Sequence, residues 1–328
     1  MKTILACSIP NSILMRPFRL SAILWLALSS FHAQTQSTPQ RYVVITFDDL
    51  PVVCRCQDNA SRMEITDKLM TILRKYNIPA LGVVNEQKLE TDGAVDPEKV
   101  ALLQKWLDHG HELGNHGYSH KNINEISFEA YLEEILKGER VTRTLAEKAG
   151  IPYRFYRHPY LSAGDSLQVR QDLDAFLKKH NYSIAPNTIT YQDYTFSGAY
   201  ETALQRGDTA LAKRIRDAYL PYTLSRWETA EQQSRDLFGR EIKQILMIHA
   251  NRINADVLGD VAQMVLDRGY KFISIDEALE DPVYSRPDSY DGHVGVTWLS
   301  RWAAEMGDAT QYNIAPVPQF VLDVRRGN

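Results

Sequence analysis

The chain has 328 residues, of which 44% are apolar and 24% are charged. A chain of this length and composition can bury a large core, as one domain or two small ones, which argues against intrinsic disorder. Its 37 basic and 41 acidic side chains leave a formal net charge of -4. Because no excess of positive charge is available to contact a phosphate backbone, a nucleic-acid partner is disfavoured.

The longest apolar run lies near the N-terminus. Two arginines precede an apolar stretch over residues 20–28, and a polar linker follows over residues 34–40. This order, with an apolar stretch too short to span a bilayer, predicts a signal peptide over residues 1–33, beginning at Met1 or Met15. We expect a secreted or periplasmic protein with no stable membrane span after cleavage. An uncleaved anchor and a buried N-terminal helix are the alternatives.

Only two cysteines, Cys54 and Cys56, follow the predicted signal peptide. Two are too few for a disulfide scaffold, and a single intervening residue makes a bridge between them geometrically awkward. No second pair is present to complete a site for a soft metal. We expect a loop feature beside the functional site, and the sequence leaves its oxidation state open.

Strand and helix patterns alternate from residue 42 onward. The expected strands are residues 42–46, 80–84, 112–115, 155–156, 183–185, 245–248 and 272–275. The expected helices are residues 62–76, 98–107, 127–149, 167–179 and 255–268. Repeated strand–helix units predict an α/β fold with a parallel sheet, and this many units predict a closed or nearly closed barrel.

Two segments interrupt this alternation. Residues 199–240 predict two charged helices with a break at Pro221, and residues 281–328 predict a C-terminal extension packed on the barrel. The extension carries Trp298, Leu299 and Trp302 at helical spacing. Packing against the barrel is the favoured interpretation of this apolar stripe, and a sugar-stacking platform is the alternative.

Two adjacent carboxylates, Asp48 and Asp49, follow the first predicted strand. In a parallel barrel the carboxyl ends of the strands form the face where reacting groups collect. Neighbouring carboxylates are costly there unless a cation or an arginine offsets their charge. A structural role, capping the following loop, explains the pair equally well when it is considered alone.

A second pattern, His116 and His120, places two imidazoles four residues apart. On a helical turn this spacing brings both to one face, where they can reach one metal ion. The pair follows the short strand 112–115, so it too lies at a strand's carboxyl end. One carboxylate and two imidazoles form a three-ligand set that leaves positions open for water and substrate, as in catalytic zinc sites.

Further polar residues follow later predicted strands. Arg157 could hold one carboxylate of the Asp pair ionised and correctly aimed. Asp193 and His249 are candidates for a carboxylate–imidazole couple in which the acid keeps the imidazole protonated as a general acid. The structural alternatives are a surface arginine and a histidine buried for packing.

Taken in order, these motifs resemble those of the polysaccharide deacetylase family, also called the NodB-homology carbohydrate esterases, over residues 41–279. The resemblance implies a distorted (β/α) barrel over residues 41–280, with a helical insertion at 199–240. By the same resemblance Asp48 is the catalytic base. Asp49, His116 and His120 would bind a divalent metal, usually zinc.

The resemblance also implies roles for later residues. Arg157 would orient Asp48, and the backbone N–H of Tyr160 would help to stabilise the oxyanion. Asp193 would tune His249 as the general acid. The chain departs from the family pattern at four positions. The family commonly has glycine, tryptophan, leucine and aspartate there, and this chain has Leu161, Tyr194, Met247 and Ala250, respectively. None of these departures removes a group that does chemistry, so we expect activity with an altered groove.

The function implied is metal-dependent hydrolysis of acetyl groups on a carbohydrate polymer or oligomer, with N-acetyl sugars of the chitin or peptidoglycan type favoured. An O-acetyl xylan esterase is one alternative. A non-catalytic carbohydrate-binding protein on the same scaffold is another, although every presumed catalytic group is present. A metal-independent amidohydrolase relative acting on small cyclic amides is the third.

Overall fold

The computed structural model describes residues 40–326 except positions 57, 291 and 311. The predicted signal peptide, residues 1–33, and nearly all of the linker lie outside the described residues. Within the described ranges, no helix is both long and apolar enough to cross a bilayer.

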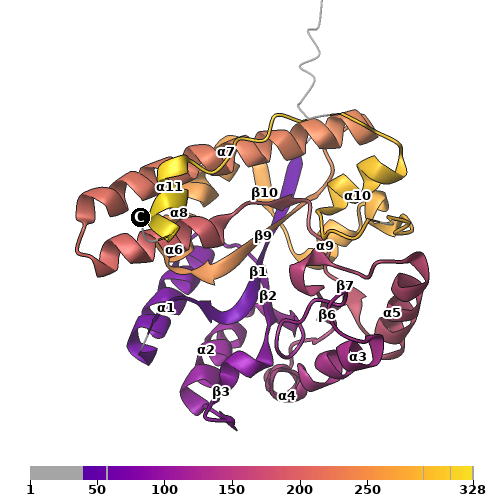
Figure 1. Cartoon of the computed structure of the whole chain (residues 1–328), viewed down its shortest axis with the longest axis horizontal. Helices are drawn as coiled ribbons and strands as arrows, with labels where there is room; N and C mark the ends of the chain where they lie inside the picture. Colours follow the sequence, from indigo (N-terminus) through magenta and orange to yellow (C-terminus); the bar gives the residue numbers. More distant parts are fainter. Residues whose placement is uncertain (1–39, 57, 291, 311, 327–328) are drawn as a thin grey trace, which may run out of the picture. The chain divides into compact units, whose positions relative to one another are not determined.

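A single parallel sheet forms the centre of the described domain (Figure 1). Its strand order is β7-β6-β5-β2-β1-β9-β8, and β10 pairs with β1 beside this path. The strands are β1 Arg41–Val53, β2 Ala80–Val84, β5 Glu112–Asn115, β6 Phe155–Tyr156, β7 Ser183–Ile184, β8 Ile189–Thr190, β9 Gln244–Asn251 and β10 Tyr270–Phe272. A small antiparallel hairpin, β3 Glu90–Thr91 with β4 Ala94–Val95, lies outside this sheet.

The sheet is curled but not closed, because its end strands β7 and β8 do not pair with each other in the described part of the chain. Every pairing within it is parallel. The predicted α/β fold, a distorted (β/α) barrel, is confirmed. The short strand β8 was not anticipated.

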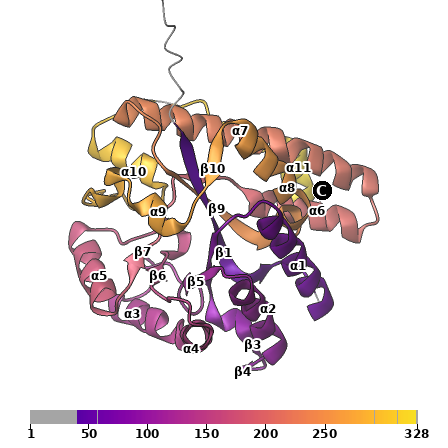
Figure 2. The same cartoon turned by 180° about the vertical axis from the view of Figure 1, so that it is seen from behind.

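Helices surround the curled sheet (Figures 1 and 2). The helices are α1 Asn59–Lys75, α2 Pro97–Asp108, α3 Phe128–Lys137, α4 Arg140–Ala149, α5 Leu167–Lys179, α6 Asp193–Gln205, α7 Thr209–Phe238, α8 Arg252–Asp267, α9 Ile275–Leu279, α10 Trp298–Glu305 and α11 Gln319–Arg326. Three 3-10 turns accompany them: η1 Glu86–Leu89, η2 Pro159–Leu161 and η3 Pro282–Ser285.

Strand β1 is the centre of the core. Val43, Val44, Ile45 and Phe47 are all fully buried, and Phe47 meets the ring of Trp106 edge-on at 5.0 Å. A strand that is buried on both faces has a continuous apolar sequence rather than an alternating one. The central position of β1 therefore follows from its sequence.

Two predicted helix boundaries are wrong. The helix expected over residues 127–149 is two helices, α3 and α4, separated at Gly138. The break expected at Pro221 is absent, since α7 runs through this residue. The chain turns instead at Gly207, where φ is 69°, and the side chain of Asp208 then caps α7 by accepting from the N–H of Leu211.

Pro221 is tolerated because buried side chains of the same helix pack against the rest of the domain. A proline within a helix lacks one donor, at a cost of about 3 kcal/mol. Tyr219, Tyr222 and Trp227 on the same helix are buried and anchor it. Such packing outweighs the local preference of one residue.

The C-terminal segment places two helices on the insertion. Helix α10 contacts α7, and α11 contacts α6. Trp298, Leu299 and Trp302 are all buried in this packing. They therefore present no face on which a sugar could stack.

Candidate active site

A bulge within β1 positions the two carboxylates. The predicted strand, residues 42–46, was too short, so Asp48 and Asp49 lie inside β1 rather than after it. Asp48 is in register with His249 on β9, whereas pairing with β2 shifts between Phe47 and Leu50. Asp49 adopts a left-handed conformation, with a φ of 65°. Adjacent carboxylates in different backbone conformations can point at different partners.

Asp49 meets the two histidines. Its Oδ1 lies 3.4 Å from Nε2 of His116 and 3.4 Å from Nε2 of His120. The three ligand atoms all lie within 4.8 Å of one another. Asp49 Oδ1 is buried without a hydrogen-bond partner among the described residues. A buried carboxylate oxygen and two imidazole nitrogens that converge in this way fit a divalent cation well.

The tautomer of His116 agrees with a ligand role. Its Nδ1 lies 2.8 Å from the carbonyl oxygen of Arg157, to which it donates, leaving Nε2 as a lone pair toward Asp49. A second hydrogen bond, from Asn85 Nδ2 to the His116 carbonyl at 2.6 Å, fixes the backbone. Such outer contacts orient metal-binding imidazoles and set their basicity.

The two histidines converge through a loop rather than the helical turn that was expected. Residues 116–120 contain no helix, and the loop turns at Gly117 and His120, where φ is 73° and 57°. Gly138 packs directly against this loop, because a Cβ at Gly138 would lie 2.6 Å from the carbonyl carbon of Gly117. The four-residue spacing therefore identified the correct pair of histidines, although a loop and not a helical turn brings their imidazoles together.

The surroundings of Asp49 and His120 keep both side chains in the protonation states that bind a cation. Burial alone would raise the pKa of Asp49, but the charge of Lys88 and the neighbouring imidazoles hold this pKa well below its usual range. Lys88 Nζ lies 3.3 Å from Asp49 Oδ2. Burial, followed by the charge of His116, lowers the pKa of His120 to about 4. Asp49 is therefore ionised and His120 neutral at neutral pH.

Lys88 was missed by the sequence analysis. It lies on η1, just after the carboxyl end of β2, and its Nζ also donates to the Asp49 carbonyl at 2.9 Å. Its position beyond a strand's carboxyl end was the signal that could have found it.

Arg157 fixes Asp48. Its Nη1 donates to Asp48 Oδ1 at 2.5 Å and contacts Thr46 Oγ1 at 2.7 Å. The remaining guanidinium nitrogens donate at 3.0 Å to the carbonyls of Ala185 and Pro186. The side chain of Arg157 is only 1% exposed. A buried guanidinium with every nitrogen engaged is a rigid support for one carboxylate.

Tyr160 lies at the mouth of the site. Its ring centroid is 4.5 Å from that of His120, and the residue is 58% exposed. Both Tyr160 and Leu161 have a left-handed backbone, with a φ of 56°. This tight turn thus carries a residue whose ring packs on His120.

Asp193 and His249 form the expected couple. Asp193 Oδ1 lies 2.8 Å from His249 Nδ1, while its Oδ2 accepts from the His249 backbone N–H and from Asn251 and Asn254. Asp193 is fully buried. Burial alone would lower the pKa of His249, but the charge and hydrogen bond of Asp193 raise it to about 9. His249 is therefore protonated at neutral pH.

The structure thus brings Asp48, Asp49, His116, His120, Arg157, Tyr160, Asp193 and His249 together at the carboxyl ends of the strands. Residues 35–181 also match the sequence model of the family described as polysaccharide deacetylase. Residues 35–181 belong to the polysaccharide deacetylase family. Asp193 and His249 lie beyond the residues matched by that family model.

Individual deacetylases are similar over shorter stretches. Peptidoglycan-N-acetylglucosamine deacetylase of Bacillus cereus is 28% identical over 36% of this chain and 36% of its own length. A bifunctional xylanase/deacetylase of Pseudobutyrivibrio xylanivorans is 23% identical over 42% of this chain, but only 20% of its own length. The chain thus spans about a third or less of these two relatives. The solved peptidoglycan deacetylase PdaC from Bacillus subtilis has 18% identity and a TM-score of 0.46, covering 74% of this chain and 91% of that one.

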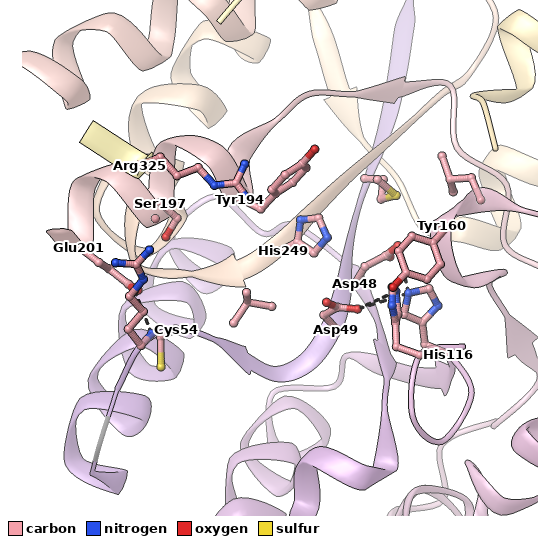
Figure 3. Close-up of a pocket in the computed structure, with 16 residues that line it drawn as sticks. Asp48, Asp49, Cys54, His116, Tyr160, Tyr194, Ser197, Glu201, His249 and Arg325 are labelled. Atoms are coloured by element: carbon pink, nitrogen blue, oxygen red, sulfur yellow. Dashed lines mark hydrogen bonds and ion pairs between the residues drawn. The ribbon is translucent and has the colours of Figure 1, made fainter. Parts of the chain in front are cut away.

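The site opens into a cavity of about 700 Å³ (Figure 3). Asp48, Asp49, His116 and His249 line one part of it. Tyr194, whose ring centroid is 6.0 Å from that of His249, lies further along. The cavity thus joins the reacting groups to a longer groove.

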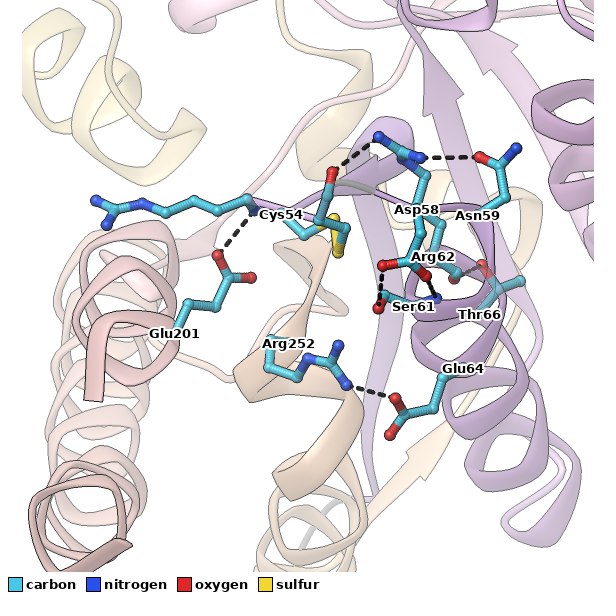
Figure 4. The surroundings of a disulfide bond; sticks show 11 residues. Cys54, Asp58, Asn59, Ser61, Arg62, Glu64, Thr66, Glu201 and Arg252 are labelled. Carbon is cyan, nitrogen blue, oxygen red and sulfur yellow. Dashed lines mark hydrogen bonds and ion pairs between the residues drawn. A yellow bond between two sulfur atoms is a disulfide. The ribbon is translucent and has the colours of Figure 1, made fainter. Parts of the chain in front are cut away.

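The loop after β1 forms another wall of this groove and corrects one expectation. Cys54 and Cys56 form a disulfide despite their spacing (Figure 4). Their Cα atoms are 5.2 Å apart, within the range that a disulfide spans, because the chain between them bows outward. The backbone N–H of Arg55, between the cysteines, donates to Glu201 Oε2 at 2.9 Å and fastens the loop to α6.

Proposed function

We propose that this protein removes acetyl groups from carbohydrate by metal-dependent hydrolysis, with N-acetyl sugars of the chitin or peptidoglycan type as substrates. The observation that carries the proposal is the juxtaposition of two carboxylates. Asp49 converges with two imidazoles within 4.8 Å. Asp48 is bonded through Oδ1 to Arg157, and its Oδ2 lies 3.8 Å from His116 Nε2, at the edge of the same cluster. One carboxylate is thereby available as a ligand and the other as a base.

Asp49, His116 and His120 would hold the metal. Three protein ligands that leave further positions open are typical of catalytic zinc, so zinc is the metal we propose. When bound, a divalent ion supplies Lewis acidity that polarises the acetyl carbonyl and makes water more acidic.

Asp48 would accept the proton of the attacking water. The ion pair with the fixed guanidinium of Arg157 holds its carboxylate in one orientation. The backbone N–H of Tyr160 would donate to the oxyanion that develops on the acetyl carbonyl. One such donor typically contributes about 2.7–4 kcal/mol of barrier lowering.

His249 would complete the reaction as general acid. Its proton passes to the departing nitrogen, so that one water and one N-acetyl group yield acetate and a free amine. Asp193 stabilises the charged imidazole and holds its Nδ1, which leaves Nε2 as the donor. The raised pKa of His249 keeps this proton available at neutral pH.

Acetate release tests the proposal. We expect purified protein loaded with zinc to release acetate from acetylated chitin oligomers or peptidoglycan, and a chelator to abolish the release. Preferential release from acetylated xylan would favour the O-acetyl alternative. Binding to these glycans without acetate release would favour the non-catalytic alternative, and activity that survives complete removal of metal would overturn the mechanism.

We also propose that the protein is exported. The sequence pattern of residues 1–33 and the disulfide between Cys54 and Cys56 both support this, since disulfides persist in oxidising compartments. A fusion of the full chain to a reporter that is active only outside the cytoplasm would test the assignment. A reporter signal that is unchanged by deleting residues 1–33 would contradict it.

A further inference from the structure

The cavity continues well beyond the reacting groups, along one face of α6. Tyr194, Ser197, Gly198 and Glu201 all line it. Their spacing of three, one and three residues is that of a single helix face. In Figure 3, Ser197 and Glu201 lie on the opposite side of His249 from Asp49. This second end of the cavity takes no part in the mechanism above.

Two arginines from distant parts of the chain converge on this helix face. Arg55 comes from the disulfide loop after β1, and Arg325 comes from α11 near the C-terminus. Both lie over Gly198. A Cβ at that residue would be 3.8 Å from Arg325 Nε and 3.9 Å from Arg55 Nη2. Both guanidinium groups are therefore within van der Waals contact of the same point on α6.

Hydroxyl groups orient both arginines. Arg55 Nη1 donates to Thr202 Oγ1 at 2.9 Å, and Arg325 Nη1 donates to Thr195 Oγ1 at 2.8 Å. Arg325 also lies over the ring of Tyr194, with its Cζ 5.1 Å from the ring centroid. These contacts hold each guanidinium in place without cancelling its charge.

Neither guanidinium has a carboxylate oxygen within 4.0 Å among the described residues. Glu201 does not change this, because it accepts from the backbone N–H of Arg55 and not from its guanidinium. With Glu201 ionised, the two arginines still leave one excess positive charge at this end. A pair of oriented guanidinium groups is the arrangement that binds a planar carboxylate best.

Two buried polar atoms beside the arginines also lack partners. Ser197 is only 3% exposed, and its Oγ makes no hydrogen bond to any described residue. The Oε1 atom of Glu201 is likewise buried and unpartnered. Buried polar atoms normally find partners, so these two are suited to the hydroxyl groups of a ligand.

We propose that this end of the cavity is a subsite for a sugar that carries a carboxylate, with Arg55 and Arg325 binding the carboxylate and Ser197 and Glu201 bonding ring hydroxyls. The inference rests on the proposed function and narrows its substrate class. The acetylated sugar occupies the metal end, and an acidic sugar of the same chain occupies the arginine end. The carboxylate belongs either to a uronic acid or to an acidic ether substituent.

Calorimetric binding of matched oligomers tests this subsite in the full protein. One ligand alternates N-acetylglucosamine with glucuronic acid, a second alternates it with N-acetylmuramic acid bearing a free carboxylate, and the methyl ester of each has the same shape without the charge. We expect the acid form of at least one ligand to bind about tenfold more tightly than its ester. The ligand that shows this preference identifies the source of the carboxylate.

Arg55→Gln and Arg325→Gln should each reduce the preference for acid over ester about five- to tenfold. Arg326→Gln is the matched control, because it removes the same charge from the same helix at a residue that does not line the cavity. An unaltered preference in both cavity variants, or an equal reduction in the control, overturns the subsite.

Acetate release is measured separately on neutral N-acetylglucosamine oligomers. If no acetate appears but the acid is still preferred, the proposed function fails and the subsite stands. If acetate is released but acid and ester bind equally, the subsite fails and the proposed function stands.

Discussion

At the scale of single residues, the backbone separates two adjacent and chemically identical side chains. Asp48 keeps strand geometry and faces the buried Arg157, whereas Asp49 turns into a left-handed conformation and faces the imidazoles. Neighbouring strand residues point to opposite faces, so without this bulge the two carboxylates could not share one site. The proposed division into base and ligand thus depends on one backbone angle.

Replacing the proposed base and one proposed metal ligand tests this division. We expect Asp48→Asn to lower turnover about 10²- to 10⁴-fold while leaving bound metal unchanged, because the base is lost and the ligands remain. His120→Ala should instead lose the metal. Elemental analysis alongside acetate release distinguishes the two outcomes. An Asp48→Asn protein with undiminished turnover would exclude this residue as the base.

The Asp193–His249 couple predicts a shift in pH dependence. His249 must be protonated to donate, so activity falls as pH rises through its pKa, which Asp193 raises to about 9. A bound cation would lower this pKa, so variants must be compared with the same metal. In Asp193→Asn the stabilising charge is gone, and the alkaline limb of kcat/KM should move to lower pH. If the alkaline limb of kcat/KM lies at the same pH in both proteins, it reports the titration of a group other than His249.

At the scale of elements, the break between α3 and α4 has a reason that lies outside the helices. Gly138 sits where α3 meets the loop that carries His116 and His120, and a Cβ there would lie within 2.6–2.9 Å of the backbone at Gly117 and Tyr118. The apolar periodicity of residues 127–149 continues across this point. A tertiary contact with the metal-binding loop, and not local propensity, therefore requires glycine.

Gly138→Ala should accordingly weaken metal binding. The overlap forces the loop to move, which we expect to cost about 1–3 kcal/mol of folding stability and about tenfold or more in metal affinity. Gly150→Ala is the control: it lies at the end of α4 with a φ of 69° and nothing within 4 Å of the added Cβ. It should lose about 1 kcal/mol of stability with no change in metal affinity. Denaturant unfolding and chelator competition measure the two effects, and equal metal affinities would refute the role of Gly138.

At the scale of the described domain, the C-terminal extension packs against the turn at Tyr160 and Leu161. Arg301, from α10, is buried, donates to the Leu161 carbonyl at 2.7 Å and pairs with Asp288. Gly295 packs against the same turn, since a Cβ there would overlap the Tyr160 carbonyl oxygen. The turn that would supply an oxyanion donor is thus held by residues more than 130 positions later in the chain.

Removing this support should slow catalysis. Arg301→Met leaves the Leu161 carbonyl and Asp288 without their donor, and we expect a loss of about 1–3 kcal/mol in stability and a lower kcat with little change in metal content. Arg286→Met, an exposed arginine of the same extension, is the control. Thermal unfolding and steady-state kinetics provide the measurements. A normal kcat in a folded Arg301→Met protein would separate the extension from the site.

Individual residues illustrate how far the sequence could be interpreted. The parallel α/β fold and seven of the eight candidate site residues were recognisable because strand–helix alternation and polar residues after strands are local patterns, whereas Tyr160 followed only from the family resemblance. Lys88 was overlooked although it too follows a strand, and the Cys54–Cys56 bridge depends on a backbone bend that residue spacing does not reveal. The loop conformation of residues 116–120 was not recognisable, because it depends on packing against Gly138, a residue distant in sequence. The continuous helix at Pro221 was missed for the same reason.

By itself, the sequence determined which side chains are available and roughly where strands place them, because hydrophobic periodicity and residue type are properties of short segments. Only the tertiary structure decided that Asp48 and Asp49 face different partners, and that Arg55 and Arg325 meet over one glycine. The physical reason is that a backbone bulge and a long-range contact are stabilised by packing from the rest of the chain. That packing cannot be inferred from a short segment of the sequence.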